Sequence, residues 1–211
     1  MTATNPPVFI LGIAGGSGSG KTTLARQLID RVGKERVVSL AHDSYYRDLE
    51  GADPTDYNFD HPDALETSLL VEQLKVLRKG QAVDVPLYDF STHSRSEQTE
   101  RVESRPVIIV EGILLLVDEA LRDQVDLGVF VDIEAEVRLA RRMRRDIEER
   151  GRTEDDVLRQ YEATVRPMHD RFVESSKHYA HIIITENGLG GWVADVLEAW
   201  IEGLLTPPDE L

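Results

Sequence analysis

The sequence predicts an α/β fold in which helices flank a parallel β-sheet. Short apolar runs rich in Val and Ile recur along the 211-residue chain, and longer amphipathic segments separate most of them. The runs are almost continuously apolar, which is typical of strands buried on both faces, as in a parallel sheet. With 41% hydrophobic residues, the chain is long enough and apolar enough to bury one full core.

Five apolar segments are expected to form the strands of this sheet. They span 8–14, 36–40, 107–112, 127–133 and 181–185. A helix-like pattern over 22–33 follows the first of them. We expect residues 1–211 to form a single domain around this sheet, with a frayed C-terminal tail from 206 to 211.

Residues from about 42 to 106 are expected to form an insertion between two of the strands. The segment 42–63 is polar and aromatic and has little periodicity, whereas 64–80 has a helical pattern. The segment 81–95 alternates in the manner of strands next to a turn. Long structured insertions between core strands commonly bind substrates, so we expect a substrate site here.

Composition excludes several classes of protein. The net charge of −15 argues against nucleic acid as the main partner. The absence of cysteine excludes disulfides, thiolate metal sites and a cysteine nucleophile. The start of the sequence has no secretory signal, and the longest apolar stretch, 107–117, is too short to span a bilayer. We therefore expect a soluble cytoplasmic protein with no membrane partner.

The stretch "GGSGSGKTT", residues 15–23, matches the phosphate-loop pattern G-x-x-x-x-G-K-[ST]. Its glycines allow backbone N–H groups to surround an anion, and the dipole of the following helix adds to the attraction. Because a strand precedes it and a helix follows, a chance Gly/Ser loop is the weaker interpretation, and the sheet is predicted to be of the P-loop NTPase type. Lys21 would reach the β- and γ-phosphates, and the Thr22 hydroxyl would bind Mg²⁺. The expected nucleotide-binding residues are Gly15, Gly16, Ser17, Gly18, Ser19, Gly20, Lys21, Thr22 and Thr23.

Two acidic residues lie where expected strands end. In a parallel sheet the carboxyl ends of the strands face the ligand crevice. Glu111 ends one apolar run and either binds Mg²⁺ or is a solvated strand-end residue. Asp43 follows another and either accepts a proton from an attacking hydroxyl or caps the next helix. Together with Thr22, both carboxylates are candidate metal ligands.

The segment 134–152 contains seven arginines between positions 138 and 152 but three acids. At about 100° per residue, the arginines of one helix face lie opposite an apolar face. The cationic face contains Arg138, Arg141, Arg142 and Arg145, and the apolar face contains Leu139, Ala140, Met143 and Ile147. We expect the apolar side to pack inward and the cationic side to look out, as an arginine-rich lid over the triphosphate within about 138–166. The alternative is a solvated face with ion pairs.

With these pieces in place, the chain resembles the uridine kinase family, the uridine–cytidine kinases, over roughly residues 9–200. The stretches "NFDHPDA" and "YDFSTHSR" are specific to that family, whereas the phosphate loop is shared with many others. The other matching stretches are "GGSGSGKTT", "HDSYYRDL", "VEGIL", "LGVFVDIEAEVRLARRMRRDIEERGR" and "QYEATVRPMHDRFVESSKHYAHIII".

The resemblance implies transfer of the ATP γ-phosphate to the 5′-hydroxyl of uridine or cytidine, giving UMP or CMP in pyrimidine salvage. It implies that Asp43 is the catalytic base, with Lys21, Arg142 and Arg145 as further catalytic groups. The nucleoside pocket and lid contacts that it implies are Tyr46, Asp60, Tyr88, Phe90, His93, Arg150, Arg152 and Gln160. It also implies a homotetramer and feedback inhibition by pyrimidine triphosphates. Uridine or cytidine as acceptor, and ATP or GTP as donor, stay open.

The residues themselves support part of this pocket. Tyr88 and Phe90 are two positions apart in an alternating segment, so both face one side and either form a flat wall for a base or belong to the core. Asp60 suits two ribose hydroxyls as an acceptor, and the role of His93 rests mainly on the resemblance.

Three other functions were weighed against this one. A phosphoribulokinase or pantothenate kinase would share the loop and a basic lid, but not the aromatic pocket of "YDFSTHSR". A GTP-dependent switch would carry N-K-x-D, and "NK" occurs nowhere in the chain. A nucleic-acid-dependent ATPase conflicts with the charge of −15.

Overall fold

The central element of the fold is a five-stranded parallel sheet with the strand order β2-β5-β1-β6-β7. This computed structural model describes residues 8–49, 51, 57–186 and 192–206, so the start of the sequence and the tail after Thr206 lie outside the described residues. The strands are β1 (Phe9–Gly15), β2 (Val37–Ala41), β5 (Val107–Gly112), β6 (Leu127–Asp132) and β7 (Ile182–Thr185). All five expected strands are present, and the predicted α/β fold is confirmed.

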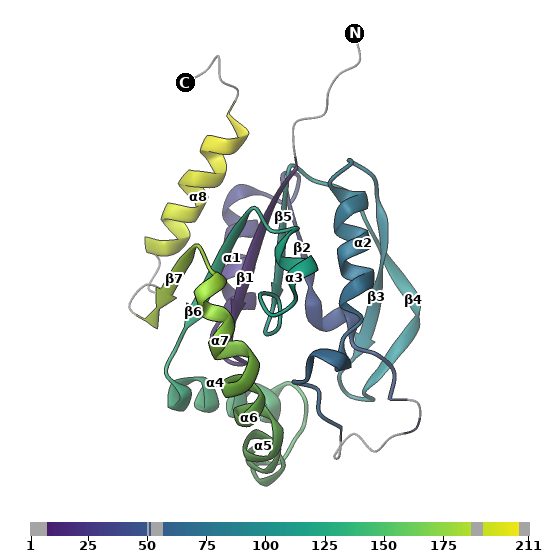
Figure 1. The fold of residues 1–211 in the computed structure, drawn as a ribbon, viewed down its shortest axis with the longest axis vertical. Coiled ribbons are helices and arrows are strands. Elements are labelled where there is room, and N and C mark those ends of the chain that lie inside the picture. The colour runs from purple at the N-terminus through teal and green to yellow at the C-terminus, as the bar shows by residue number, and fades with distance from the viewer. Residues whose placement is uncertain (1–7, 50, 52–56, 187–191, 207–211) are drawn as a thin grey trace.

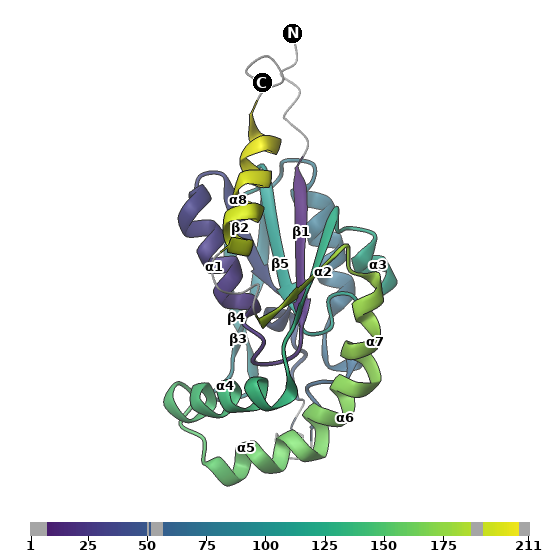
Figure 2. The same cartoon turned by 90° about the vertical axis from the view of Figure 1, so that its left-hand side faces the viewer.

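Both faces of the sheet are covered, which is why its strands are apolar at nearly every position. Helices α1 (Lys21–Val32) and α8 (Trp192–Leu205) cover one face, and α2 (Thr67–Leu77) and α3 (Glu119–Arg122) cover the other (Figures 1 and 2). Ile10 packs toward α2 and its neighbours, while Leu11 packs toward α1, and both are fully buried. Alternate residues of one strand therefore enter two separate hydrophobic clusters.

A third group of helices crosses the end of the sheet at which β1 and β6 finish (Figure 2). It begins with α4 (Ala135–Glu148), which follows β6 directly, and α5 (Glu154–Gln160). From α5 the chain stays helical through α6 (Arg166–Met168) and α7 (Glu174–Ser176). Two π-helical turns, Tyr161–Val165 and His169–Val173, lie between these helices. No helix in the described ranges is both long and apolar enough to cross a membrane.

The segment between β2 and β5 contains the helix and strands expected there. It forms two short 3₁₀ helices, η1 (His42–Tyr45) and η2 (Pro62–Ala64), then α2, and then a hairpin. The hairpin strands β3 (Val83–Asp89) and β4 (Ser94–Val102) pair antiparallel in a two-stranded sheet that is separate from the central one. Figure 1 shows this hairpin beside α2, away from β6 and β7.

The predicted orientation of α4 is wrong. Arg138 and Arg142 are buried, with exposed fractions of 6% and 7%, while Ile147 is 40% exposed. The inward face of α4 meets polar groups: Arg142 Nη1 donates to Ser17 Oγ at 2.8 Å, and Arg138 Nε donates to the Ile133 carbonyl at 2.9 Å. Buried polar groups require hydrogen-bond partners, so arginines occupy this face instead of apolar side chains.

Candidate active site

The phosphate loop connects the end of β1 to the start of α1. Gly20 is the N-cap of α1, with φ of +101°, and no side chain caps the first turn. Gly18, with φ of +80°, lies directly against the main-chain carbonyl of Arg138, where a Cβ atom would find no room. The N–H groups at the start of α1 are thus left for an anion, as at other phosphate-binding helix ends.

Lys21 supplies a buried cation inside this loop. Its side chain is 7% exposed, and its Nζ donates to the Gly16 carbonyl at 3.1 Å. Burial lowers the pKa of Lys21, while the nearby carboxylates of Glu111 and Asp43 act in the opposite direction. The ammonium group is therefore held between the loop and the two acids at the strand ends.

Thr22 and Glu111 meet at the end of β5. The Thr22 hydroxyl donates to Glu111 Oε1 at 2.7 Å. Burial raises the pKa of Glu111, and Lys21 opposes that shift. Two oxygen ligands side by side next to a phosphate loop fit Mg²⁺, which usually takes one or two protein oxygens and completes its shell with water and phosphate. Within the described ranges, no group of three or more His, Cys, Asp or Glu side chains could hold a metal by itself.

A pocket beside the loop gathers residues from distant parts of the chain. The lining residues come from the phosphate loop, from η1 and the residue after it, from the two residues before His61, and from the hairpin. Others come from the residue after β5, from α4, from the loop between α4 and α5, and from α5. The lining residues are Ser17, Asp43, Tyr46, Phe59, Asp60, Tyr88, Phe90, His93, Ile113, Arg142, Arg145, Arg150, Arg152 and Gln160. Every residue expected in the nucleoside pocket and its lid contacts is therefore here, together with Phe59 and Ile113, which the sequence reasoning missed.

A second hollow lies along the phosphate loop. Its lining residues are Gly18, Gly20, Lys21, Thr22, Thr23, Arg141, Arg144, Arg145 and Glu149. Arg145 lines both hollows, so one guanidinium lies at the boundary between the loop and the aromatic pocket. Arg141 lines the second hollow but not the first, and its guanidinium pairs with Glu186 at 3.3 Å.

The aromatic rings form an angled cluster instead of the expected flat wall. The Tyr88 and Phe90 rings are 5.2 Å apart at 72°, and Tyr46 is 5.2 Å from Tyr88. Phe90 lies in the turn just beyond the end of β3 at Asp89, so the strand alternation on which the flat wall was predicted does not extend to it. Burial raises the pKa of Tyr88 to about 12, so its hydroxyl remains protonated. That hydroxyl is buried, and no described residue forms a hydrogen bond with it.

His93 lies at the tip of the hairpin in a strained conformation. Its φ of +52° makes it the single non-glycine residue with positive φ in the described part of the chain. The ring stacks on Phe59 at 4.8 Å and 29°. Burial and the charges of Arg152 and Arg150 lower the pKa of His93, so the neutral ring offers one donor and one acceptor near pH 7.

Two acids of the pocket have different environments. Asp43 lies inside η1, whose N-cap is Ala41, so the capping role considered for Asp43 is not observed. Its Oδ1 atom is buried and has no hydrogen-bond partner among the residues that the structure describes. Asp60 is 6% exposed, and burial raises its pKa while Arg142 opposes the shift. Both carboxylates line the pocket and can accept hydrogen bonds from a ligand.

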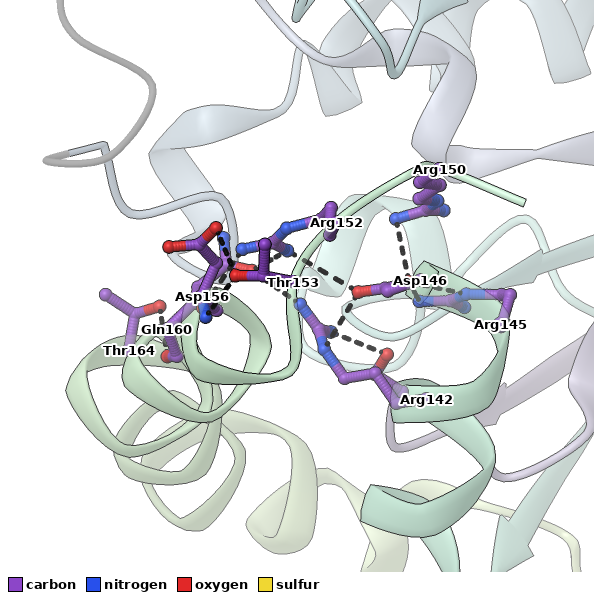
Figure 3. Close-up of polar contacts among 10 residues, drawn as sticks. Arg142, Arg145, Asp146, Arg150, Arg152, Thr153, Asp156, Gln160 and Thr164 are labelled. Carbon is purple, nitrogen blue, oxygen red and sulfur yellow. Dashed lines mark hydrogen bonds and ion pairs between the residues drawn. The ribbon is translucent and has the colours of Figure 1, made fainter. Parts of the chain in front are cut away.

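The arginines of α4 and the following loop converge on Asp146 (Figure 3). Asp146 is completely buried, and the nearest contact runs from Arg145 Nη2 to its Oδ1 at 2.8 Å. Gln160 Oε1 accepts from Arg142 Nη2 at 2.9 Å and from Arg152 Nη1 at 2.6 Å. In the sequence, Asp146 is one of three acids among the seven arginines between positions 138 and 152. Its spacing of four residues from both Arg142 and Arg150 was the signal that could have identified it.

Comparison with known proteins identifies the family to which this site belongs. Residues 10–188 match the Phosphoribulokinase / Uridine kinase family. This chain belongs to that family. The kinase activity that the resemblance to the uridine kinase family implied is thereby confirmed, and the family name covers two kinds of kinase, phosphoribulokinases and uridine kinases.

Two relatives and one solved structure show what the chain is similar to. The chain is 49% identical to the uridine kinase of Chloroflexus aurantiacus over 200 residues, which are 93% of this chain and 96% of that protein. It is 46% identical to the uridine kinase of Lactococcus lactis subsp. cremoris, covering 93% of this chain and 97% of the relative. The phosphoribulokinase of Rhodobacter spheroides shares the fold, with a TM-score of 0.59 over 85% of this chain and 70% of its own, but 14% identity.

Proposed function

We propose that this member of the family is a uridine kinase, which transfers the γ-phosphate of ATP to the 5′-hydroxyl of uridine, cytidine or both. One observation carries the proposal: Arg145 borders both the phosphate-loop hollow and an aromatic pocket that also contains Asp43. A nucleoside in that pocket would place its hydroxyl near a carboxylate and next to the transferring phosphate. The identity of up to 49% to uridine kinases supports the same acceptor class.

On this proposal, the chain mainly positions and neutralises the reacting groups. Phosphoryl transfer passes through a loose transition state with its charge on the γ-phosphate oxygens. The N–H groups of the loop and Lys21 would hold the β- and γ-phosphates. Arg142 and Arg145 would approach the transferred group from α4. Their positions on a packed helix, with Arg142 bonded to Ser17 of the loop, fit groups that must be in place before reaction.

Thr22 and Glu111 are the residues that would hold Mg²⁺, with Asp43 nearby. When bound, the ion would offset phosphate charge and orient the phosphate groups. The hydrogen bond between Thr22 and Glu111 fixes the two side chains in the absence of the ion.

Asp43 is the residue that we assign as the base. A carboxylate is far too weak a base to remove the proton of an alcohol in advance. The 5′-proton would therefore transfer late, as the new bond to phosphorus forms, and much of the value of Asp43 would be orientation of the hydroxyl. The unpartnered Oδ1 atom leaves a buried acceptor for this contact.

The remaining pocket residues would bind the nucleoside. Tyr46, Tyr88 and Phe90 would contact the base, and His93 would hydrogen-bond its edge. Asp60 would accept from the ribose hydroxyls. Arg150, Arg152 and Gln160 would close the pocket as part of the arginine-rich lid.

The assembly and the donor are further parts of the proposal. A homotetramer is consistent with the exposed apolar residues Ile182 and Ile183 on β7, the last strand of the described sheet. Light scattering would give the mass of the assembly. ATP is the proposed donor, with GTP as the competitor, and paired assays with the two nucleotides would rank them.

A panel of acceptors tests the proposal directly. The protein is incubated with ATP and Mg²⁺ together with uridine, cytidine, other nucleosides, ribulose 5-phosphate or pantothenate, and the products are separated. Formation of UMP or CMP is expected. Phosphorylation of ribulose 5-phosphate or pantothenate, with no nucleoside monophosphate, would reject the uridine kinase proposal.

A further inference from the structure

Asp146 is a fully buried carboxylate at the centre of the arginine cluster, and the proposed reaction gives it no role. Arg145 Nη2 lies 2.8 Å from its Oδ1 atom. Three further contacts are 3.5 Å long, namely Arg142 Nε to Oδ2, Arg150 Nη1 to Oδ1 and Arg152 Nη1 to Oδ2. Burying an ionised side chain away from water destabilises a fold unless an opposite charge pairs with it. Here one buried carboxylate pairs with four guanidinium groups.

The four arginines line the same pocket, so their charges repel one another across a poorly solvated space. Burial and the neighbouring Arg145 lower the pKa of Arg150, while Asp146 acts in the opposite direction. Asp146 offsets one of these four charges, and Asp43 and Asp60, the other acids at the pocket, offset two more, so one positive charge remains in excess. Asp146 therefore allows the guanidinium groups to converge without cancelling the attraction for a phosphate group.

The contacts of Asp146 also hold in place the loop that follows α4. Its main-chain carbonyl accepts from the N–H of Arg152 at 3.1 Å, across a turn in which Gly151 has φ of +64°. Arg145 directs both Nε and Nη2 to Oδ1, at 2.9 and 2.8 Å. Its Nη1 group lies outside this contact. One residue thus fixes the loop that carries two arginines and the orientation of a third.

We propose that Asp146 is a positioning residue, whose carboxylate holds Arg142, Arg145, Arg150 and Arg152 in one arrangement before the phosphate groups of the substrates enter. It acts through the arginines and touches no substrate. Its effect on kcat rests on the proposed function, whereas its effect on the arginines of the free protein does not.

The Asp146→Asn variant tests the role of the charge, because asparagine keeps the size of the side chain. The amide also turns a donor toward guanidinium groups that themselves only donate. A fall in kcat of about 10²-fold is expected, the loss typical of a misplaced catalytic group. The control is Glu148→Gln, which removes the same charge from an exposed site on the same helix and should stay within about twofold of wild type.

A double-mutant cycle with Arg145→Gln separates positioning from general damage. Because the shortest contact of Asp146 is with Arg145, Asp146→Asn should lower kcat by far less than about 10²-fold once Arg145 is absent, and the remaining loss reflects Arg142, Arg150 and Arg152. Losses that simply multiply would show that Asp146 acts elsewhere, and would overturn the proposal.

The final measurement needs no reaction. In the ¹H–¹⁵N spectrum of the free protein, the Arg145 Nε–H signal, identified by its loss in Arg145→Gln, should be resolved in wild type and broadened or shifted in Asp146→Asn. An unchanged signal would overturn the proposal even if the wild type makes no UMP, a result that would instead reject the proposed function. If the asparagine variant does not fold, Asp146→Glu replaces it throughout. That variant keeps the charge but displaces the carboxylate, and a wild-type signal with wild-type kcat would again overturn the proposal.

Discussion

At the scale of single residues, the environment of Asp43 decides what the site can do. A buried acceptor atom without a partner is costly unless a ligand completes it, and Asp43 Oδ1 is such an atom beside the phosphate loop. The Tyr88 hydroxyl in the same pocket is also buried and lacks a hydrogen-bond partner among the described residues. The proposed 5′-hydroxyl and the pyrimidine edge would supply the missing partners.

Asp43→Asn should lower the rate of the chemical step by about 10²–10⁴-fold, because the amide can hydrogen-bond the 5′-hydroxyl but cannot accept its proton. Affinities for uridine and ATP should change little. Single-turnover kinetics and calorimetry measure the two effects separately, and Asp30→Asn on the exposed side of α1 is the control. A chemical step within a few-fold of wild type in a folded variant would reject Asp43 as the base.

Glu111→Gln should raise the concentration of Mg²⁺ needed for half-maximal activity, because an anionic oxygen ligand is replaced by a neutral one beside Thr22. A titration of activity with Mg²⁺ at saturating ATP measures the shift. Glu119→Gln, at the exposed start of α3, should leave the titration curve unchanged. The same Mg²⁺ dependence in both variants would place Glu111 away from the metal.

At the scale of elements, α4 joins the two hollows through the positions of its arginines. Arg145→Ala should lower kcat by roughly 10³-fold, the lower end for arginines that stabilise a transferring phosphoryl group, while uridine affinity changes far less. The comparison is Arg144→Ala, one position along the helix, whose exposed side chain lines the loop hollow but not the aromatic pocket, so its loss of kcat should be much smaller. Steady-state kinetics compare the two. Equal small losses would mean that these arginines are a solvated face.

The hairpin β3–β4 is attached to η1 by Arg95. Its guanidinium donates to the Tyr45 carbonyl at 3.0 Å and the Tyr46 carbonyl at 3.1 Å, and it pairs with Glu66 at 2.5 Å. Arg95→Met keeps the length of the side chain but removes these contacts. The KM for uridine should rise several-fold while the KM for ATP stays constant, because the hairpin carries residues of the aromatic pocket, whereas the phosphate loop connects β1 to α1. Equal rises in both constants would show that the whole fold had loosened.

The elements differ in how far the sequence predicts them, for physical reasons. The strands of the central sheet are buried on both faces, so each carries its own apolar signal. In β4 most side chains are exposed, so "SRSEQTERV" has little alternation, and the end of that strand at Val102 is set by pairing with β3. The sequence predicts that α4 has a cationic and an apolar face. Which of the two faces inward depends on the phosphate loop, which is distant in the sequence.

At the scale of the whole molecule, the buried His169 links stability to pH. Burial and the charge of Arg138 lower the pKa of His169 to about 4, from 6.5 in an unfolded chain. Between these values the unfolded chain binds more protons, so the free energy of unfolding decreases as pH falls through this range. His169 should contribute about 2 kcal/mol to the loss between pH 7 and pH 5, and the buried His42, whose pKa burial also lowers to about 4, should add to it. Urea denaturation at the two values measures it, and His169→Gln should lack this component. An identical pH dependence in that variant would assign the effect to other groups.

The candidate site shows the same division between local and long-range information. The phosphate loop is contiguous, so its pattern can be read directly from residues 15–23. The pocket draws on segments more than 100 residues apart, and its members were anticipated through the family motifs and not through spacing. The strained tip at His93 depends on how the hairpin packs, which no local pattern records, whereas Asp146 has a local signal in its spacing of four residues from Arg142 and Arg150.

The separation of the hairpin from the central sheet has a consequence for how such enzymes diversify. In the described part of the chain no strand pairing joins β3 and β4 to the five parallel strands, while the phosphate loop and Lys21 lie where the central sheet meets its first helix. Aromatic residues on the hairpin can therefore be exchanged, by natural drift or by grafting, without redesign of the phosphate-handling half. A chimera carrying another nucleoside-recognition hairpin on this scaffold would inherit its triphosphate chemistry intact and acquire a new acceptor.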